Sequence, residues 1–241
     1  MKIALIGYGK MGHIIEHIAL ERGHEVVSKV DVDNQEEFES EAFASADVAI
    51  EFTVPAKAVE NYRKAWAAGV PVVSGTTGWN AVLPELKEEI ATNGYTLFWA
   101  SNFSLGVNLF FELNRRLAQM MNRYANYDVA MTEIHHTEKK DAPSGTAITL
   151  AEGVLENLDR KEEWVLVDSQ QSTVNSQLGI EALREGKVPG THIVSYDSAV
   201  DTITIKHEAK SREGFALGAV VAAEFLVGKP AGFYSMSDLI K

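Results

Sequence analysis

The chain of 241 residues contains no cysteine and no long apolar run. Without cysteine it can form neither disulfides nor thiolate sites for metals or catalysis. No stretch approaches the roughly 20 consecutive apolar residues that a membrane-spanning helix requires, and the apolar segment at residues 1–7 is too short for a signal peptide. We therefore expect a soluble cytoplasmic protein that has no membrane partner.

Positive charge is also scarce. The chain has 22 Lys and Arg against 34 Asp and Glu, a formal net charge of -12 at pH 7. Nonspecific binding of nucleic acids depends on cations that replace the counterions along the phosphates, so this balance argues against a broad nucleic-acid surface. The hydrophobic content of 46% is sufficient for two packed units in a chain of this length.

The first part of the chain alternates predicted strands with predicted helices. The strands are expected at residues 2–6, 25–31, 47–53, 70–74 and 95–99. Such alternation with short connections favours an α/β fold, a Rossmann-like doubly wound parallel sheet with helices on both faces. We expect a dinucleotide-binding domain over residues 1–104.

The pattern changes after this point. One long amphipathic helix is predicted at 106–124, with an apolar stripe of Leu109, Phe110, Leu113 and Leu117. Further strands are predicted at 129–134, 164–167, 192–196 and 202–207. We expect a second α+β domain with a mixed or antiparallel sheet over 105–212. A C-terminal segment, 213–241, contains a helix at 214–227 and is expected to return to the first domain.

Residues 7–12 read Gly-Tyr-Gly-Lys-Met-Gly, a G-x-G-x-x-G motif between the first predicted strand and helix. In this context Gly7 permits a tight turn, Gly9 lets a pyrophosphate approach the backbone, and Gly12 allows close packing of helix on strand. Asp31 lies 19 residues after Gly12, at the end of the second predicted strand. A carboxylate at this position can accept hydrogen bonds from the adenine ribose. Together these features predict a dinucleotide site, and a purely structural turn is the alternative.

A second glycine-containing turn, Gly-Thr-Thr-Gly at 75–78, follows the fourth predicted strand. It lies at the carboxyl edge of the sheet, where open α/β sheets bind ligands. The turn is therefore placed to line the nicotinamide end of a dinucleotide, although by itself such a sequence is more often an ordinary turn.

The segment 133–146 reads Glu-Ile-His-His-Thr-Glu-Lys-Lys-Asp-Ala-Pro-Ser-Gly-Thr and combines proton donors with anion-binding groups. His135, His136 and Lys139 are titratable or cationic. Ser144, Gly145 and Thr146 can offer hydroxyls and free N–H groups at a helix N-terminus, where a carboxylate would bind. The structural alternative is a helix N-cap that follows a solvated run of charge.

A metal site is not expected in this segment. Adjacent histidines on an extended strand point to opposite faces, and no cysteine or helical His-x-x-x-His pair supplies further ligands.

Residues 133–147 closely resemble the motif E-x-H-H-x-x-K-x-D-A-P-S-G-T-A of the dihydrodipicolinate reductase family, also called 4-hydroxy-tetrahydrodipicolinate reductases, of bacterial lysine and diaminopimelate biosynthesis. The similarity continues in the family's order at 51–53, 75–78, 100–104 and 232–236. It therefore spans nearly the whole chain.

The resemblance implies that NADH or NADPH delivers hydride to 4-hydroxy-tetrahydrodipicolinate, or to its dehydrated form, to give tetrahydrodipicolinate. His135 and Lys139 would be the catalytic pair, with Lys139 the favoured proton donor. The cyclic dicarboxylate substrate would be held by His136, Lys139, Ser144, Gly145 and Thr146. The dinucleotide would be held by Gly7, Gly9, Lys10, Met11, Gly12, Asp31, Phe52, Thr53, Gly75, Thr76, Thr77, Ala100, Ser101, Asn102 and Phe103. The resemblance also implies a homotetramer assembled through the sheet of the second domain.

The sequence departs from the family at the first loop, which is one residue shorter than the frequent G-x-x-G-R-M-G form and carries Lys10 in place of arginine. Asp31 would repel a 2′-phosphate, and no arginine stands at 32–34 to bind one, so we expect NADH to be preferred. Lys29 shares the strand face of Asp31 and could neutralise part of this repulsion.

Two other functions remain open at this stage. One is an NAD-dependent dehydrogenase of a sugar or an amino acid with the same two-domain plan. The other is a non-catalytic NADH-sensing module, against which the intact segment from His135 to Thr146 argues.

Overall fold

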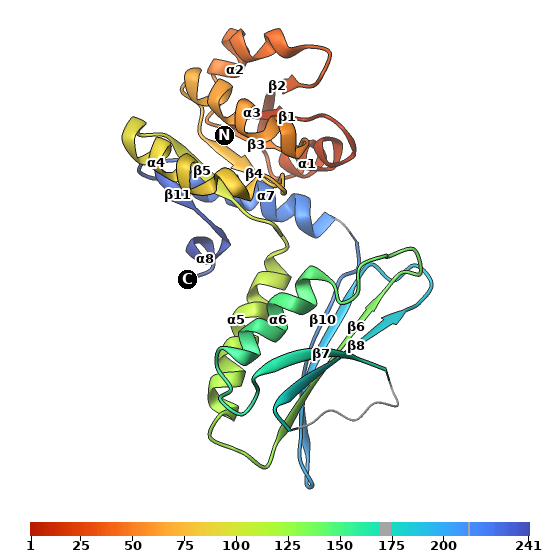
Figure 1. The fold of residues 1–241 in the computed structure, drawn as a ribbon. Helices are drawn as coiled ribbons and strands as arrows, with labels where there is room; N and C mark the ends of the chain where they lie inside the picture. The colour runs from red at the N-terminus through yellow and green to blue at the C-terminus, as the bar shows by residue number, and fades with distance from the viewer. Residues whose placement is uncertain (169–174, 212) are drawn as a thin grey trace. The chain divides into compact units, whose positions relative to one another are not determined.

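The computed structural model describes residues 1–168, 175–211 and 213–241. These residues form two compact units, one comprising Met1–Leu105 with Glu213–Lys241 and the other Gly106–Arg212 (Figure 1). The C-terminal helix α7 (Glu213–Leu226) lies in the first unit. It is tied to the segment after the first helix by ion pairs of Glu224 with Arg22 and His24, at 2.8 and 2.7 Å.

The first unit contains a six-stranded sheet in the order β11-β5-β4-β3-β1-β2, in which every adjacent pair is parallel. Its strands are β1 (Lys2–Ile6), β2 (Glu25–Val30), β3 (Val48–Glu51), β4 (Val72–Ser74), β5 (Thr96–Trp99) and β11 (Gly232–Tyr234). The central strands are nearly continuous apolar runs because helices cover both of their faces. Five of the six were predicted, and β11 was missed because three half-buried residues carry no periodic pattern.

Two apolar cores lie on opposite faces of this sheet. Helices α1 (Lys10–Glu21) and α7 pack with alternate strand residues in one core. The other core contains α2 (Glu41–Ala44), α3 (Pro55–Ala67), α4 (Leu83–Asn93) and the 3₁₀ segment η1 (Gln35–Glu39). A second 3₁₀ segment, η2 (Asn80–Val82), precedes α4, and α8 (Met236–Leu239) is near the C-terminus. The predicted doubly wound parallel sheet is therefore confirmed.

The second unit contains a mixed five-stranded sheet in the order β10-β9-β6-β8-β7. Its elements are α5 (Leu105–Met121), β6 (Asp128–His135), α6 (Gly145–Leu155), β7 (Glu163–Val167), β8 (Gln177–Arg184), β9 (Thr191–Asp197) and β10 (Thr202–Glu208). Strands β6, β8 and β7 are parallel to one another, whereas β9 and β10 pair antiparallel. Helices α5 and α6 cover one face of the sheet and close a third apolar core (Figure 1).

This arrangement confirms the predicted α+β architecture, although β8 was not predicted. Three consecutive buried residues, Leu178, Gly179 and Ile180, interrupt the alternation that identifies a strand facing solvent on one side. Among the helices of the described residues, none combines the length and the apolarity needed to cross a membrane.

Candidate active site

Two glycines of the first loop, Gly7 and Gly12, lie where a side chain would clash with the backbone of the strand-to-helix turn. Gly7 has a φ of +90°, and a Cβ atom there would lie 2.2 Å from the carbonyl oxygen of Phe52. A Cβ atom on Gly12 would lie 2.4 Å from the carbonyl oxygen of Gly7. Gly9, which directly precedes α1, has open space at the same position. The loop thus leaves room for a ligand at the N-terminus of α1, where N–H groups attract phosphates.

A cavity of about 500 Å³ opens at the carboxyl ends of β1, β2 and β3. Five of the predicted dinucleotide contacts line it: Gly7, Gly9, Asp31, Phe52 and Thr53. Gln35, Lys57, Glu60 and Lys64 line it as well and were not predicted.

The other predicted contacts belong to the same unit. Lys10, Met11 and Gly12 form the first turn of α1, and Gly75, Thr76 and Thr77 follow β4. Ala100, Ser101, Asn102 and Phe103 follow β5. All these segments begin at the carboxyl ends of parallel strands, so the fold brings the predicted dinucleotide residues to one edge of the sheet.

The carboxylate of Asp31 accepts a hydrogen bond from the N–H of Val32 at 2.9 Å and forms no ion pair within the described part of the chain. Lys29 turns instead to Glu16, at 2.5 Å, and donates to the hydroxyl of Tyr8 at 3.1 Å. Lys29 is therefore already engaged and does not neutralise Asp31.

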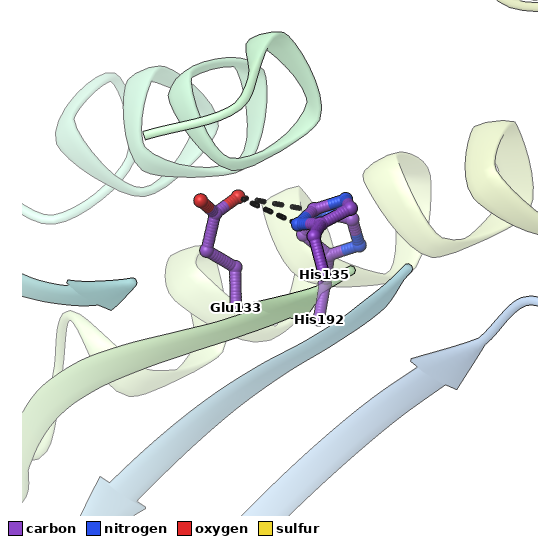
Figure 2. A group of neighbouring side chains, drawn as sticks. All are labelled: Glu133, His135 and His192. Carbon is purple, nitrogen blue, oxygen red and sulfur yellow. Dashed lines mark ion pairs between the residues drawn. The ribbon is translucent and has the colours of Figure 1, made fainter. Parts of the chain in front are cut away.

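In the second unit, Glu133 and His135 lie on the buried face of β6. The register of the sheet places His192 of β9 opposite Glu133, and Arg184 of β8 opposite His135. Figure 2 shows the carboxylate of Glu133 directed at the two imidazoles, whose ring centroids are 5.1 Å apart. Three strands thus contribute to one cluster.

Both oxygens of Glu133 are occupied. Its Oε2 accepts from the N–H of Ser144 at 3.0 Å and lies 3.5 Å from His135 Nδ1 and 3.8 Å from His192 Nε2. Its Oε1 accepts from two nitrogens of Arg184, each at 3.3 Å. Glu133 therefore joins the strand to the start of α6.

Arg184 also fixes the loop between β6 and α6. Its guanidinium donates to the carbonyl oxygens of Lys139 at 3.3 Å and of Asp141 at 2.6 Å. The ammonium of Lys139 donates to both carboxylate oxygens of Asp141 at 2.8 Å, and this hydrogen bond lowers the pKa of Asp141. Lys139 is thus held as a charged donor beside the cluster, while His136 lies half-buried just beyond β6.

Burial favours the neutral form of the two imidazoles. Burial and, after it, the neighbouring His135 together lower the pKa of His192 to about 4. Burial also lowers the pKa of His135, although the charge of Glu133 opposes the shift. The Nδ1 atom of each ring lacks a hydrogen-bond partner among the described residues. The contacts of both rings with Glu133, dashed in Figure 2, become ion pairs only when a ring is protonated.

Ser144 is the N-cap of α6, which is the structural alternative to the substrate-binding role expected for it. Its Oγ accepts from the N–H of Ala147 at 3.2 Å and lies 3.2 Å from His192 Nε2, so the hydroxyl and the N–H of this buried residue are both used within the protein. In the described residues nothing accepts from the N–H groups of Gly145 and Thr146, and the space beside Gly145 is open. The free anion-binding groups are these two N–H donors.

Arg184 and His192 were not predicted. Spacing along the chain gave no reason to expect metal ligands, but the sheet register brings donor atoms of Glu133, His135 and His192 within 4.8 Å of one another. The three groups could together ligate a metal, but Arg184 already supplies the positive charge and both oxygens of Glu133 are engaged.

Comparisons with known proteins agree with the motif. The family description "Dihydrodipicolinate reductase, N-terminus" matches residues 1–103, and "Dihydrodipicolinate reductase, C-terminus" matches residues 106–240. A protein of Christiangramia forsetii named 4-hydroxy-tetrahydrodipicolinate reductase is 48% identical over 100% of this chain and 98% of its own length. One of Methanopyrus kandleri with the same name is 42% identical over 81% of this chain and 71% of its own length.

Solved structures share the fold. A dipicolinate-bound dihydrodipicolinate reductase from a Paenisporosarcina species superposes with a TM-score of 0.74 at 21% identity, covering 98% of this chain and 97% of that one. An amine dehydrogenase from Mycobacterium smegmatis matches less well, with a TM-score of 0.51 at 12% identity, covering 97% of this chain and 94% of that one. The two family matches and the similar relatives show that the chain belongs to the dihydrodipicolinate reductase family.

Proposed function

We propose that this chain reduces 4-hydroxy-tetrahydrodipicolinate, whose hydroxyl leaves as water, or its dehydrated form, to tetrahydrodipicolinate in lysine and diaminopimelate biosynthesis. The observation that carries the proposal is the assembly of the 133–146 segment around Glu133, with a charged lysine, a buried histidine and a free helix N-terminus side by side. The chain is an NAD(P)H-dependent reductase of its family, and the assignments of individual residues below are proposals.

The substrate carboxylates are proposed to bind at the start of α6. The N–H groups of Gly145 and Thr146 are free to donate to one carboxylate, and helix N-termini favour anions. His136 and Lys139 add polar and cationic contacts. Ser144 contributes by holding this turn, since its own donor groups are used by Glu133 and by the cap.

Lys139 is proposed to donate the proton that accompanies hydride transfer. It is an ammonium group paired with Asp141, whereas burial lowers the pKa of His135 and leaves that ring neutral before substrate arrives. A bound dianion would raise the proton affinity of His135, so His135 assists once the substrate is in place. When bound, the nicotinamide cofactor supplies the hydride, and the chain supplies orientation, charge complementarity and the proton.

NADH is proposed to be the better cofactor. Asp31 is an unneutralised carboxylate at the end of β2, and Lys57 and Lys64, which line the same cavity, are both paired with Glu60 at 2.8 Å. A 2′-phosphate would meet this carboxylate, while both lysines of the described cavity lining are already paired. Asp31→Ala should shift the ratio of kcat/KM values toward NADPH, and an unchanged ratio would show that Asp31 does not read the ribose.

The protein is further proposed to act in the cytoplasm as a homotetramer formed through the second sheet. Support comes from apolar side chains that this sheet leaves exposed, namely Leu166, Leu183 and Ile203. Exposed apolar groups on a sheet are typical of subunit contacts.

The proposed reaction is tested by following NADH oxidation while substrate is generated in situ from pyruvate and aspartate semialdehyde. We expect oxidation that stops when aspartate semialdehyde is omitted. Oxidation of a sugar or amino acid with NAD⁺, without this activity, would identify a dehydrogenase instead. NADH binding without turnover of any of these compounds would identify a sensing module.

A further inference from the structure

A buried carboxylate lies beneath the turn at 75–78 in the first unit. Glu51, the last residue of β3, is fully buried and forms no ion pair within the described residues. Three hydroxyls donate to it: those of Thr53 and Thr76 to Oε1, and that of Ser74 to Oε2 at 2.5 Å. The Thr76 contact is 2.9 Å long. Glu51 therefore links the ends of two adjacent strands.

The directions of these hydrogen bonds are fixed by a second layer of donors. The hydroxyl of Thr53 accepts from the side-chain amide of Asn61 at 3.2 Å. The hydroxyl of Thr76 accepts from the N–H of Thr53 at 2.9 Å, and the hydroxyl of Ser74 accepts from the N–H of Thr76 at 3.2 Å. Because each hydroxyl already accepts an N–H, its own proton is directed at Glu51.

Two indoles hold Thr76 from the other side. The Nε1–H groups of Trp79 and Trp99 both donate to the carbonyl oxygen of Thr76, at 2.7 and 2.9 Å. Their rings pack edge to face with centroids 5.4 Å apart. The N–H, the carbonyl and the hydroxyl of Thr76 are thus all engaged inside the protein, and the ring of Phe52 leaves no room for a Cβ atom on the neighbouring Gly75, which would lie 2.2 Å away.

We propose that Glu51 is a positioning residue for the nicotinamide end of the dinucleotide. Together with Trp79 and Trp99, Glu51 fixes the Thr76 peptide before the cofactor binds. The inference rests on the proposed function and on the prediction from the sequence that the 75–78 turn lines the nicotinamide end. A turn already held in its binding shape loses little conformational entropy when the ligand arrives, so affinity for that end of the ligand increases.

The test compares NADH with ADP-ribose, which lacks the nicotinamide, by calorimetric titration of the full chain. Glu51→Met keeps the length of the side chain and removes the acceptors. We expect it to bind NADH about tenfold more weakly, the factor that corresponds to about 1.4 kcal/mol, and to bind ADP-ribose as the wild type does. Glu51→Gln should restore NADH binding to within about threefold, since its amide oxygen can accept from both threonines and its amide nitrogen can donate to Ser74.

Trp99→Phe removes one of the two donors to the Thr76 carbonyl and serves if Glu51→Met does not fold. It should weaken NADH binding about threefold and leave ADP-ribose unaffected. Tyr62→Phe is the matched control, because it removes the hydroxyl that contacts Ser74 at 2.7 Å and keeps the ring that packs edge to face on Trp79, while within the described residues no hydrogen bond joins this hydroxyl to Glu51 or Thr76. It should bind both ligands as the wild type does.

Unchanged NADH affinity in both Glu51→Met and Trp99→Phe would overturn the inference. An equal loss of NADH and ADP-ribose would also overturn it, because the change would then affect the whole domain rather than the nicotinamide end. If the wild type binds NADH but reduces no substrate, the proposed function fails, and this inference is judged separately by the variants.

Discussion

Replacing Arg184 by methionine should separate the contribution of the second sheet to catalysis from its contribution to cofactor binding. The guanidinium makes two 3.3 Å contacts with the buried Glu133 and reaches the carbonyl oxygens of Lys139 and Asp141. Arg184→Met keeps most of the aliphatic stem and leaves Glu133 without its countercharge. The loop that carries Lys139 would then lose its anchor.

The loss of unfolding free energy expected in Arg184→Met can be derived from these contacts. Hydrogen bonds to charged groups contribute about 1.5–3 kcal/mol each, but the 3.3 Å distances are long and the Arg184 side chain is 21% exposed, so water replaces part of the interaction. We expect the unfolding free energy of the second unit to fall by about 3 kcal/mol, which is the lower end of the range observed when one partner of a buried ion pair is removed. Misplacement of Lys139 should lower kcat/KM for the dicarboxylate about 100-fold.

Stability is measured by urea unfolding, with hydrogen exchange of peptides from β6, β8 and β9 to report on the second unit. The Kd of NADH should not change, because Arg184 lies outside the unit that contains the dinucleotide residues. The double variant Glu133→Gln/Arg184→Met should be less destabilised than the sum of the single variants, by about 1–2 kcal/mol. Wild-type stability and kcat/KM in Arg184→Met would refute the role assigned to Arg184.

Three further predictions concern the same unit. Gly145→Val fills the open space at the start of α6. It should raise the KM of the substrate and weaken the binding of a competitive pyridine dicarboxylate inhibitor. If both values were unchanged, Gly145 would not belong to the site. Lys139→Ala should lower kcat about 100-fold, and His135→Ala should also lower kcat. Neither variant should change the affinity for NADH. Near-normal turnover in both variants would exclude the 133–146 segment from the mechanism. The folded-state pKa of His192, about 4, lies below its unfolded value of about 6.5, so its contribution to stability is present above pH 6.5 and is lost as the pH falls toward 4. Urea unfolding at pH 7 and pH 4.5 should show a smaller loss in His192→Asn than in wild type, and equal losses would contradict the burial of a neutral ring.

The features that could be predicted from sequence are those encoded by neighbouring residues. The G-x-G-x-x-G loop before a helix, the helix that begins at Gly145 and the strand that leads to Asp31 each depend on short-range geometry, and the structure has each of them, with β2 ending one residue before Asp31. The continuous apolar strands of the first sheet are also local signals, because burial on both faces gives them a distinctive composition.

The partners of Glu133 could not be predicted in this way. His192 and Arg184 become its neighbours only through the register of β9 and β8 with β6, and β8 carries no clear alternation. The same pairing determines that the N–H of Ser144 is used by Glu133 and is not available to a ligand. Such contacts depend on the tertiary alignment of distant strands, which a single sequence does not specify.

The most direct test of the proposed function is to follow the hydride itself. NADH deuterated at both C4 positions is supplied with enzymatically generated substrate, and the product is analysed by mass spectrometry after single turnover. The account predicts tetrahydrodipicolinate that carries one deuterium on a ring carbon, with Lys139→Ala giving the same labelled product more slowly. Product without deuterium, or oxidation of NADH that yields no reduced dicarboxylate, would contradict hydride transfer to this substrate.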